Sequence, residues 1–572
     1  SVHYAGYELR DGYIDHWLVA GPQAISVTGA ERFAGEDAKL KIARHYYEGD
    51  PGVAGLPIQW ETLRMGDVDL RWEYYPCHPE DHFLDLTAFY RTCHYLRAWA
   101  YAQVVSPSAQ DVNLVLTTNG PADLWLNGDH VHRQEHFYHQ IPHSVAFQAS
   151  LREGENEVLV RFEEVAMREC PYAMALQIAG LLSPGSSVRL PVPNENVARR
   201  LALERIFDAA YLDRDVYVWD EEIELRWPEQ MEDSASVAVR LQTPEGRIYA
   251  EAMRIGSAGN HARLSRPYEI PEGRYHAVVM PRPKEYYEGN QRVLRKIPLW
   301  AMRNRYADTP YGTLAERRRE ALDNAARREE NVFSEIAKMA LGRWSQVRID
   351  AVMEAIEGIN RRQDCSDFYL VGLLGMMHRY GDDPSFPEVL KAPLEACVLN
   401  FRYWMDEPGS DAMCFWSENH QILFHACEIL AGQLYPERSF TNAGQPGRWH
   451  REKGERLATA WLKKRGMGGF REWDSNCYFE EDLLALSHLA DLAEAPQVYE
   501  LAAVVMDKMF FTMAVNSYRG AFGSTHGRTY APLIKGARLE GTAGIGRLMW
   551  GMGVFNPRVL GTVSLACAEG YE

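Results

Sequence analysis

The chain has 572 residues, of which 46% are hydrophobic and 24% are charged, a composition typical of folded globular domains rather than of disordered or fibrous proteins. Its 61 Lys and Arg residues against 79 Asp and Glu residues give a formal net charge of −18. Surfaces that bind nucleic acid or anionic membranes need a basic footprint, so neither partner is expected. An anionic ligand would have to meet a local basic cleft.

No run in the sequence approaches the ~20 consecutive apolar residues of a membrane helix, and the first residues lack the form of a signal peptide. The nine cysteines are odd in number and show no CxxC spacing, so neither a disulfide framework nor a zinc knuckle is expected. The compartment stays open between the cytoplasm and a secreted or periplasmic location after removal of a signal. The oligomeric state stays open as well.

Residues 1–195 are predicted to form an antiparallel β-sandwich. Residues 112–131 alternate apolar and polar side chains across two Asn-Gly turns, and residues 151–165 repeat the pattern around a Gly-Glu-Asn turn. We expect two hairpin-like units here. The segments LWLNG and GENEVLVRFE resemble the jelly-roll, galactose-binding-like sandwich that is a common accessory domain of carbohydrate-active enzymes.

A second, smaller β-sandwich or spacer domain is expected over residues 196–305. A Pro-, Gly- and Ser-rich segment at 181–196 separates it from the first domain. Residues 215–227, 235–255 and 273–281 then show the period of two that is typical of strands.

From residue 306 to residue 572 the apolar spacing becomes helical. The sequence predicts nine helices, near 315–340, 346–361, 366–379, 386–404, 417–433, 449–465, 480–494, 496–516 and 541–550. Antiparallel helix hairpins of this kind can curve into an α/α toroid, and a closed toroid of six hairpins needs about twelve helices. The predicted fold is therefore a multidomain α+β chain in which β-sandwich domains precede an incomplete or open α/α toroid.

Three segments of the helical part concentrate polar side chains at helix starts or in loops, where functional residues are frequent. In the first, 415–421, Ser417 is a natural N-cap that places the next three residues in the first turn of a helix, facing the rim of a cavity. The other two segments are 466–486 and 517–530. Together they contribute the candidates Trp416, Glu418, Asn419, His420, Trp473, Asp474, Asn476, Tyr478, Arg519, His526, Arg528 and Tyr530.

The pair Asn419-His420 at a helix start, Tyr478 after a glycine-rich turn and the later His526 resemble the constellation of toroid-fold polysaccharide lyases of the heparinase II/III and alginate-lyase type. The likeness covers the helical part only. It implies that Asn419 neutralises the uronate carboxylate of the substrate, that Tyr478 transfers a proton at C5 or O4, and that His420 or His526 is its partner. The family usually carries its β-domain after the toroid, whereas here the β-domains come first.

The chemistry of β-elimination requires the same groups. The C5 proton of a 4-linked uronide is unreactive until close donors neutralise the adjacent carboxylate, and Asn419, Arg519 and Arg528 are candidates for this role. A base is needed at C5 and an acid at O4. One tyrosine serves both if neighbouring positive charge deprotonates it, its free pKa being about 10, whereas a histidine needs less adjustment.

The expected substrate is an anionic oligo- or polysaccharide. No cofactor is expected, and a requirement for a divalent metal is left open. The residues predicted to bind the substrate are Trp416, Glu418, Trp473, Asp474, Asn476, Arg519, Arg528 and Tyr530.

Two other functions stay open. An inverting glycosidase needs an acid and a base ~6.5–9.5 Å apart, which Glu418 paired with Asp474, or with Glu480 or Glu481, would supply. A non-catalytic carbohydrate-binding protein is the other possibility, with the N-terminal sandwich as its binding domain.

Two further patterns have alternative interpretations. A basic strip over 448–471 would either guide a polyanion into a cleft or form a solvated helix face with glutamate partners. A histidine-rich tract at 129–143 would either hold a surface metal or consist of ordinary surface histidines.

Overall fold

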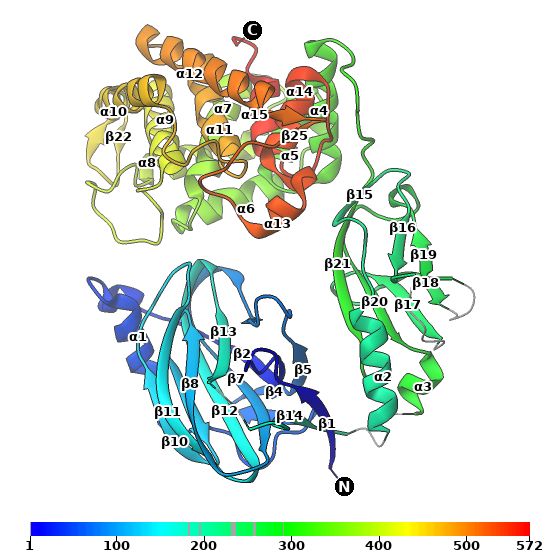
Figure 1. Cartoon of the computed structure of the whole chain (residues 1–572). Helices are drawn as coiled ribbons and strands as arrows, with labels where there is room; N and C mark the ends of the chain where they lie inside the picture. Colours follow the sequence, from blue (N-terminus) through cyan, green and yellow to red (C-terminus); the bar gives the residue numbers. More distant parts are fainter. Residues whose placement is uncertain are drawn as a thin grey trace. The chain divides into compact units, whose positions relative to one another are not determined.

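The computed structural model describes residues 2–180, 183–193, 196–229, 236–254, 259–289 and 291–571. The chain is a multidomain α+β protein, as predicted (Figure 1). Its contacts divide it into two compact units: Ser1–Ala209 with Asp233–Ala238 and Met280–Arg295, and Ala210–Glu232 with Val239–Val279 and Lys296–Glu572. The three predicted domain ranges stay predictions, and residues 194 and 195 at the first boundary lie outside the described residues.

The first unit contains two antiparallel sheets. Their strands are β1 (His3–Glu8), β2 (His16–Ser26), β5 (Glu73–Pro76), β6 (Leu84–Asp85), β7 (Ala88–Ser106), β8 (Gln110–Thr118), β9 (Ala122–Leu126), β10 (Asp129–Gln134), β11 (His143–Leu151), β12 (Gly154–Cys170), β13 (Ala173–Ala179) and β14 (Ser187–Val192). The larger sheet has the order β1-β14-β7-β12-β9-β10, with β2 paired to β5 and β7, and the smaller has the order β11-β8-β13-β6. Trp99 and Phe162 of the larger sheet share one core with Leu116 of the smaller.

The predicted hairpins are correct in one place. β9 and β10 pair across Asn127 and Gly128, whose φ values of 55° and 88° suit a two-residue hairpin turn. In contrast, β8 and β9 belong to different sheets, as do β11 and β12, so these connections cross between sheets. The hairpin prediction is wrong there because alternation shows which face of a strand is buried but not which strand it pairs with.

The segment predicted as a linker, 181–196, contains strand β14, which pairs with β1 and β7; residues 181, 182, 194 and 195 lie outside the described residues. It is followed by a helix that was not predicted, α2 (Val197–Asp208). Asn196 caps this helix, because its side chain accepts a hydrogen bond from the backbone N–H of Arg199.

All three strand patterns predicted after this helix contain strands, although residues 235 and 255 at the ends of one of them are not described. The strands are β15 (Val216–Val218), β16 (Ile223–Arg226), β17 (Val237–Gln242), β18 (Ile248–Arg254), β19 (His261–Ser265), β20 (Gly273–Pro281) and β21 (Arg295–Met302), with the short helix α3 (Pro283–Tyr287) before the last. Five of them form a sheet in the order β15-β21-β20-β17-β18, and β16 pairs with β19.

Residues 291–571 are all described, and they contain twelve α-helices where nine were predicted. These are α4 (Leu314–Arg328), α5 (Val332–Ala340), α6 (Ile349–Asn360), α7 (Ser366–Tyr380), α8 (Glu388–Asn400), α9 (Glu418–Leu434), α10 (Gly447–Gly468), α11 (Phe479–Leu492), α12 (Pro496–Val515), α13 (Ala531–Lys535), α14 (Gly541–Trp550) and α15 (Leu560–Cys567). The predicted helix 315–340 is two helices, since Glu329 adopts a left-handed φ of 50° and Asn331 caps α5. The short helices α13 and α15 were missed.

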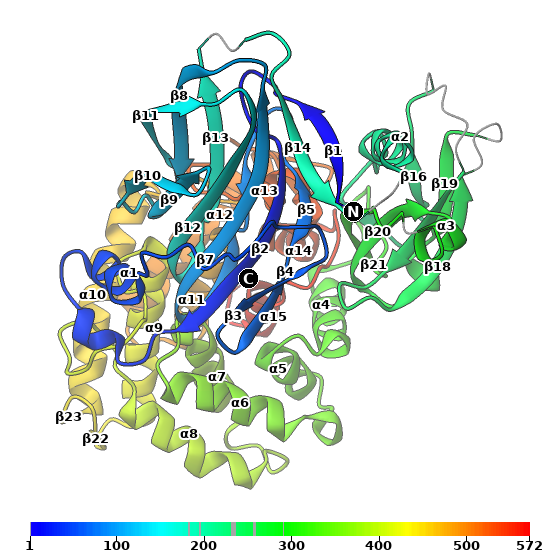
Figure 2. The ribbon, with the colours of Figure 1, turned by 90° about the horizontal axis from the view of Figure 1, so that it is seen from below.

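The last helix of the chain, α15, packs against the first two helices of the helical part, α4 and α5. α15 packs against α4, α5, α11 and α14, while α9 packs against α7, α10 and α11. α6 lies beside α8, as Figure 2 shows. The toroid arrangement stays a prediction. The expectation that the toroid is incomplete or open was based on a count of nine helices, and that count is wrong because these residues contain twelve. None of the described helices combines the length and hydrophobicity needed to cross a membrane.

Candidate active site

Two loops of the helical part lie together and form the framework of the site. One precedes α11, and the other joins β25 (Ala521–Phe522) to α13. Gly527 N donates to Trp473 O at 2.9 Å, and Arg528 N donates to Glu472 O at 3.2 Å. Ser475 Oγ donates to Arg528 O at 2.7 Å. These bonds fix the backbone on either side of Arg528 and hold it against the start of α11.

Arg528 contacts three polar side chains. Its Nη1 donates to Glu472 Oε1 at 2.7 Å, and its Nη2 donates to the hydroxyl oxygens of Tyr478 at 2.9 Å and Tyr530 at 3.2 Å. The two hydroxyls lie 2.8 Å apart. The guanidinium carbon is 3.8 Å from the centre of the Tyr478 ring. Because the Arg528 side chain is 28% exposed, a ligand in solvent can reach this group.

The protonation of Tyr478 differs from the expectation. Burial raises the pKa of Tyr478, and the positive charge of Arg528 opposes the rise without cancelling it. The tyrosine therefore keeps its proton at neutral pH, so the condition under which one tyrosine would serve as both base and acid is not met. The effect of desolvation on the pKa is larger than that of the Arg528 charge. This arrangement suits a proton donor better than a base.

His420 belongs to a second group of polar side chains, deeper in the helical part. It lies in the first turn of α9 and is buried. Its Nδ1 is 2.7 Å from Oδ2 of Asp367 in the first turn of α7, and its ring stacks on Phe368 with centroids 4.9 Å apart. Since an ionised carboxylate only accepts hydrogen bonds, this contact assigns the proton to Nδ1 and leaves Nε2 as an acceptor.

Asp367 was missed in the sequence. An acidic residue in the first turn of a helix is explained by the helix dipole alone, so no local signal connected it with a histidine 53 positions later. Burial raises the pKa of Asp367, and the contact with His420 opposes that rise.

Asn419 is completely buried, in contrast to the predicted position at a cavity rim. The reason is that α9 is covered by three other helices. Its Oδ1 accepts a hydrogen bond from Ser417 Oγ at 2.8 Å, so Ser417 occupies the N-cap position without capping a backbone N–H. Within the described part of the chain, Asn419 Nδ2 has no hydrogen-bond partner. An unused buried donor costs about 1–3 kcal/mol, which a ligand acceptor would recover.

The carboxylate of Glu418 makes structural contacts with α10 and with the loop before α11. Its carboxylate accepts hydrogen bonds from the backbone N–H groups of Arg471 at 2.9 Å and Glu472 at 3.1 Å, and it forms an ion pair with Arg465. Asp474 accepts a bond from Ser524 Oγ at 3.4 Å. Glu418 therefore holds the loop before α11 in place rather than presenting a free carboxylate.

Asn476 and His526 also make structural contacts. Asn476 Nδ2 donates to Glu540 Oε1 at 2.6 Å. The ring of His526 lies between two backbone carbonyl oxygens, with Nδ1 2.6 Å from that of Asp474 and Nε2 3.2 Å from that of Phe522. Because both ring nitrogens lie next to backbone carbonyl oxygens, these contacts indicate that His526 stabilises the conformation of the loop.

Glu472 connects the two polar groups. It pairs with Arg528, its backbone N–H donates to Glu418, and Arg528, Glu418 and His420 all lie near enough to influence its pKa. Burial is the largest influence and raises that pKa. The side chains of Trp416 and Trp473, at the start of α9 and in the loop before α11, are 69% and 60% exposed. Their flat faces are available to a ligand.

Arg519 lies elsewhere. It occupies the turn between β24 (Ser517–Tyr518) and β25, with a φ of 48°, and forms an ion pair with Asp308 at 2.6 Å. The structure thus brings together Glu472, Tyr478, Arg528 and Tyr530, and links them to His420, but it places Arg519 in a separate pocket.

Two groups of side chains in the described residues have ligand atoms close enough for a metal ion, within 4.8 Å of one another: Asp364, Cys365 and His420, and Glu407, Glu428 and His450. In the second group, the ammonium of Lys453 lies 3.5 Å from an oxygen of each glutamate and supplies positive charge itself.

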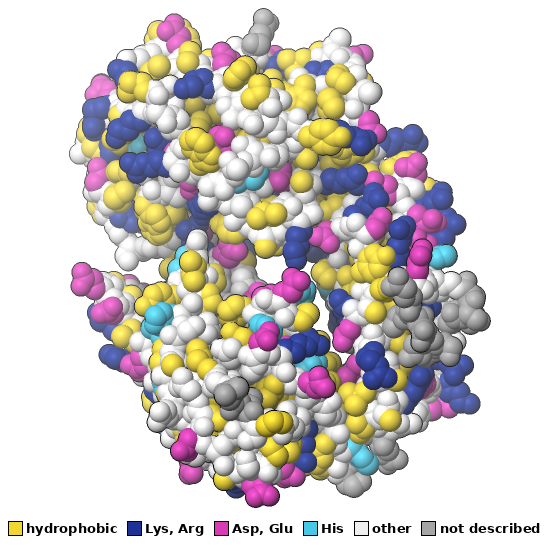
Figure 3. Space-filling model, in the orientation of Figure 1, with side chains coloured by type: hydrophobic (Ala, Val, Ile, Leu, Met, Phe, Trp, Pro, Cys, Tyr) yellow, Lys and Arg dark blue, Asp and Glu magenta, His cyan; other side chains and the backbone are white. Residues whose placement is uncertain are grey.

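The basic strip over 448–471 lies mostly on α10. His450, Lys453 and Arg465 of this strip are buried, and Arg451 pairs with Glu455 and Glu494. In Figure 3, basic and acidic side chains are interspersed over the helical part of the face shown. These pairings favour the interpretation as a helix face with acidic partners.

No protein-family model and no curated protein matches the chain. Among solved structures, a family 35 carbohydrate-binding module of Clostridium thermocellum is 17% identical over 17% of this chain and 89% of its own, with a TM-score of 0.13. A Faecalibacterium prausnitzii β-glucuronidase is 12% identical over 54% of this chain and 47% of its own, with a TM-score of 0.16. A Ruminococcus gnavus β-glucuronidase is 12% identical over 57% and 52%, with a TM-score of 0.15. The chain spans about half the length of these glucuronidases, and similarities this low support no conclusion about its fold or function.

Proposed function

We propose that this protein is a polysaccharide lyase that cleaves a uronic-acid-containing glycan by β-elimination. The observation that carries the proposal is the position of the Tyr478 hydroxyl, 2.9 Å from Arg528 Nη2 and 2.8 Å from the hydroxyl of Tyr530. The raised pKa keeps the proton on Tyr478 before reaction. Once that proton leaves, the two neighbours stabilise the phenolate that forms.

In this mechanism Arg528, which solvent reaches, binds and neutralises the uronate carboxylate. Asn419 supplies a second donor, deeper in the site, that no described residue uses. Neutralisation lowers the free energy of the anion formed at C5, which makes the C5 proton removable.

His420 is the proposed base. Its Nε2 takes the C5 proton, the electron pair of that C–H bond forms the C4–C5 double bond, the C4–O4 bond breaks, and O4 receives the proton of Tyr478. Asp367, bonded to Nδ1, orients the imidazole and stabilises the imidazolium that forms. The step uses groups of this chain alone, and the exposed rings of Trp416 and Trp473 hold the neighbouring sugars.

A second candidate is inverting hydrolysis, which one observation favours. Glu472 Oε2 is buried without a hydrogen-bond partner in the described residues, and burial raises the pKa of this carboxyl group. A raised pKa is a property that general acids of glycosidases share. Asp474 would supply the carboxylate that acts as the base. The carboxylate of Glu418 already accepts hydrogen bonds from the backbone N–H groups of Arg471 and Glu472 and pairs with Arg465.

The deciding experiment is incubation with alginate, glycosaminoglycan, pectic and glucuronan substrates, following both the ultraviolet absorbance of unsaturated uronates and the release of reducing ends. We expect an absorbance rise for the natural chain that Tyr478→Phe loses. Tyr499→Phe, a hydroxyl deletion on α12, is the matched control and should keep the activity. Reducing ends without absorbance would establish hydrolysis, and the absence of both products would refute a catalytic role on these substrates.

A further inference from the structure

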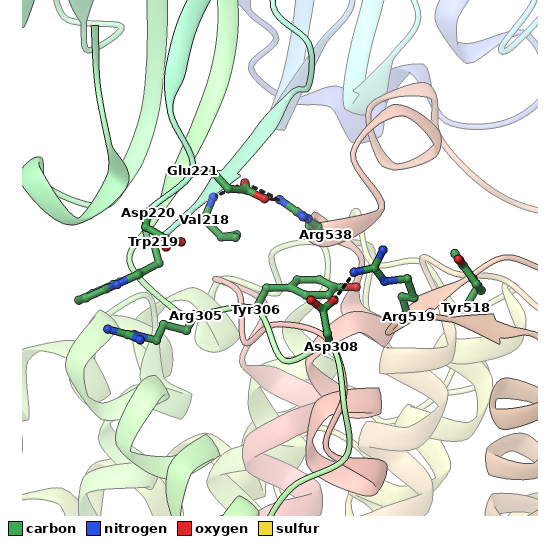
Figure 4. Close-up of a pocket in the computed structure, with 10 residues that line it drawn as sticks. All are labelled: Val218, Trp219, Asp220, Glu221, Arg305, Tyr306, Asp308, Tyr518, Arg519 and Arg538. Carbon is green, nitrogen blue, oxygen red and sulfur yellow. Dashed lines mark hydrogen bonds and ion pairs between the residues drawn. The ribbon is translucent and has the colours of Figure 1, made fainter. Parts of the chain in front are cut away.

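Carboxylates in the second compact unit differ in the groups that surround them. In the pocket drawn in Figure 4, Asp308 pairs with Arg519 at 2.6 Å. Elsewhere, the ammonium of Lys453 lies 3.5 Å from the carboxylate of Glu428. A carboxylate that already faces a cation attracts a metal ion less strongly, because the two positive charges repel each other. A third group, at the start of α7, combines a carboxylate with two other kinds of metal ligand.

This third group consists of Asp364, Cys365 and His420. A carboxylate oxygen, the Sγ atom and a ring nitrogen of these residues all lie within 4.8 Å of one another. Zinc binds such atoms at ~2.0–2.3 Å, and a tetrahedral ion keeps them about 3.3–3.8 Å apart, so small side-chain rotations close the group around an ion. Thiolate and imidazole ligands favour zinc-like transition metals over Mg²⁺ and Ca²⁺, which prefer oxygen ligands.

The turn before α7 fixes the position of Cys365. This residue occupies the N-cap position of α7 with a left-handed φ of 66°. The backbone N–H of Ser366 donates to Gln363 O at 3.1 Å, and that of Phe368 donates to Cys365 O at 3.1 Å. Asp364 and Cys365 are half-buried, so an ion can reach them from solvent. The ligands of this turn are therefore both held in place and accessible.

Asp367 orients the third ligand, His420. Its Oδ2 lies 2.7 Å from Nδ1, so Nε2 is the nitrogen that presents a lone pair. Among the described residues Nε2 has no hydrogen-bond partner, although the His420 side chain is only 2% exposed. Histidines that bind metals commonly donate their other N–H to a carboxylate, which fixes the ring and raises its basicity. The contact between Asp367 and His420 has this form.

We propose that Asp364, Cys365 and His420 bind a zinc-like divalent metal ion, with Asp367 as the carboxylate that orients the imidazole. The metal replaces the proton of the Cys365 thiol, and that proton passes to solvent. A metal on Nε2 occupies the lone pair that the proposed elimination requires, so the bound ion inhibits elimination. This inhibition rests on the proposed function, whereas the binding of the metal does not.

The test is titration of the full chain with Co²⁺ as a spectroscopic substitute for zinc, after treatment with a chelator and under reducing conditions. A cobalt–thiolate bond gives a charge-transfer band in the near ultraviolet, which oxygen and imidazole ligands alone do not give. We expect the band to saturate at about one Co²⁺ per chain and to disappear when Zn²⁺ displaces the cobalt. Because the band needs a thiolate, it does not report on the group that contains Glu428 and His450.

Variants assign the band to these residues. Cys365→Ser should abolish it, and Asp364→Asn should weaken Co²⁺ binding at least about tenfold. Asp367→Asn, which changes only the orienting group, should weaken binding by about 10–100-fold. Cys93→Ser removes another half-buried cysteine, and Asp382→Asn removes an exposed carboxylate just after α7. Both controls should bind Co²⁺ like the natural chain.

The proposal is overturned if no cobalt–thiolate band forms, if the band persists in Cys365→Ser, or if Asp364→Asn binds Co²⁺ as tightly as the natural chain. Thermal unfolding of each metal-free variant shows whether a lost band is a local effect. Where the elimination assay detects activity, Zn²⁺ at full occupancy should abolish it, and persistent activity would refute coordination by Nε2 of His420. Where the assay detects none, the cobalt spectrum still decides whether the metal site exists.

Discussion

Nδ1 of His420 lies 2.7 Å from Oδ2 of Asp367, and both side chains are buried. The two residues occupy the first turns of α9 and α7, so the packing of these helices fixes the imidazole relative to the carboxylate. A contact between two helix starts is rigid, and rigidity is what a positioned base requires.

Asp367→Asn should lower the rate of elimination by ~10²–10⁴-fold, because the amide no longer stabilises the imidazolium and allows the other tautomer. Steady-state kinetics across pH provides the measurement. Asp350→Asn removes an exposed charge from the first turn of α6 and serves as control. Unchanged kinetics in Asp367→Asn would contradict the role of Asp367 in orienting and stabilising the imidazole.

Trp416→Ala and Trp473→Ala should each raise KM about three- to tenfold with little change in kcat, because the stacking contributions of such rings are ~0.5–1.5 kcal/mol and act on bound substrate and transition state alike. Phe511→Ala is the matched control, since Phe511 is a similarly exposed ring on α12. Initial rates over a range of substrate concentrations separate the two constants. If Trp416→Ala and Trp473→Ala had the same KM as Phe511→Ala, the substrate would not contact these two tryptophans.

The buried carboxyl group of Glu428 predicts a pH dependence of stability. Burial raises the pKa of Glu428 to about 8, with Lys453 opposing the rise, whereas in an unfolded chain a glutamate titrates near ~4.3. The native state thus binds this proton more tightly. The stabilising contribution is fully present below the unfolded pKa and is lost as pH rises through the folded pKa of about 8.

Accordingly, the unfolding temperature of the natural chain should fall more steeply than that of Glu428→Gln as pH increases from slightly acidic to alkaline. Differential scanning calorimetry at several pH values measures this difference. Glu388→Gln, whose side chain is 85% exposed, should follow the natural chain. Parallel curves for the natural chain and Glu428→Gln would show that the group does not titrate in this range.

Two glycines of α10 predict opposite effects of the same substitution. A Cβ on Gly447 would lie 2.0 Å from the carbonyl oxygen of Tyr435, whereas a Cβ on Gly466 meets nothing within 4 Å. Gly447→Ala should therefore destabilise the protein by about 2 kcal/mol or more. Gly466→Ala should stabilise it by ~0.5–1 kcal/mol, because alanine has the higher helix propensity. Thermal unfolding of both variants tests the pair, and similar shifts in both would contradict the close approach at Gly447.

The sequence by itself predicted the alternation of strands before residue 306 and the helical spacing after it. Both are local properties, since the side chains that create a period lie within one or two turns of each other. It also predicted the loops that carry Tyr478 and Arg528, because polar and aromatic side chains interrupt the apolar pattern there. Short helices such as Leu560–Cys567 were missed, since one or two turns show too little of a period.

The tertiary structure decided the remaining features. It paired Asp367 with His420, buried Asn419, placed Arg519 in a different pocket and raised the pKa of Tyr478. Each of these outcomes depends on which helices cover a residue and how much water they exclude. Burial and pairing are set by residues far apart in the chain, and so no local spacing contains them.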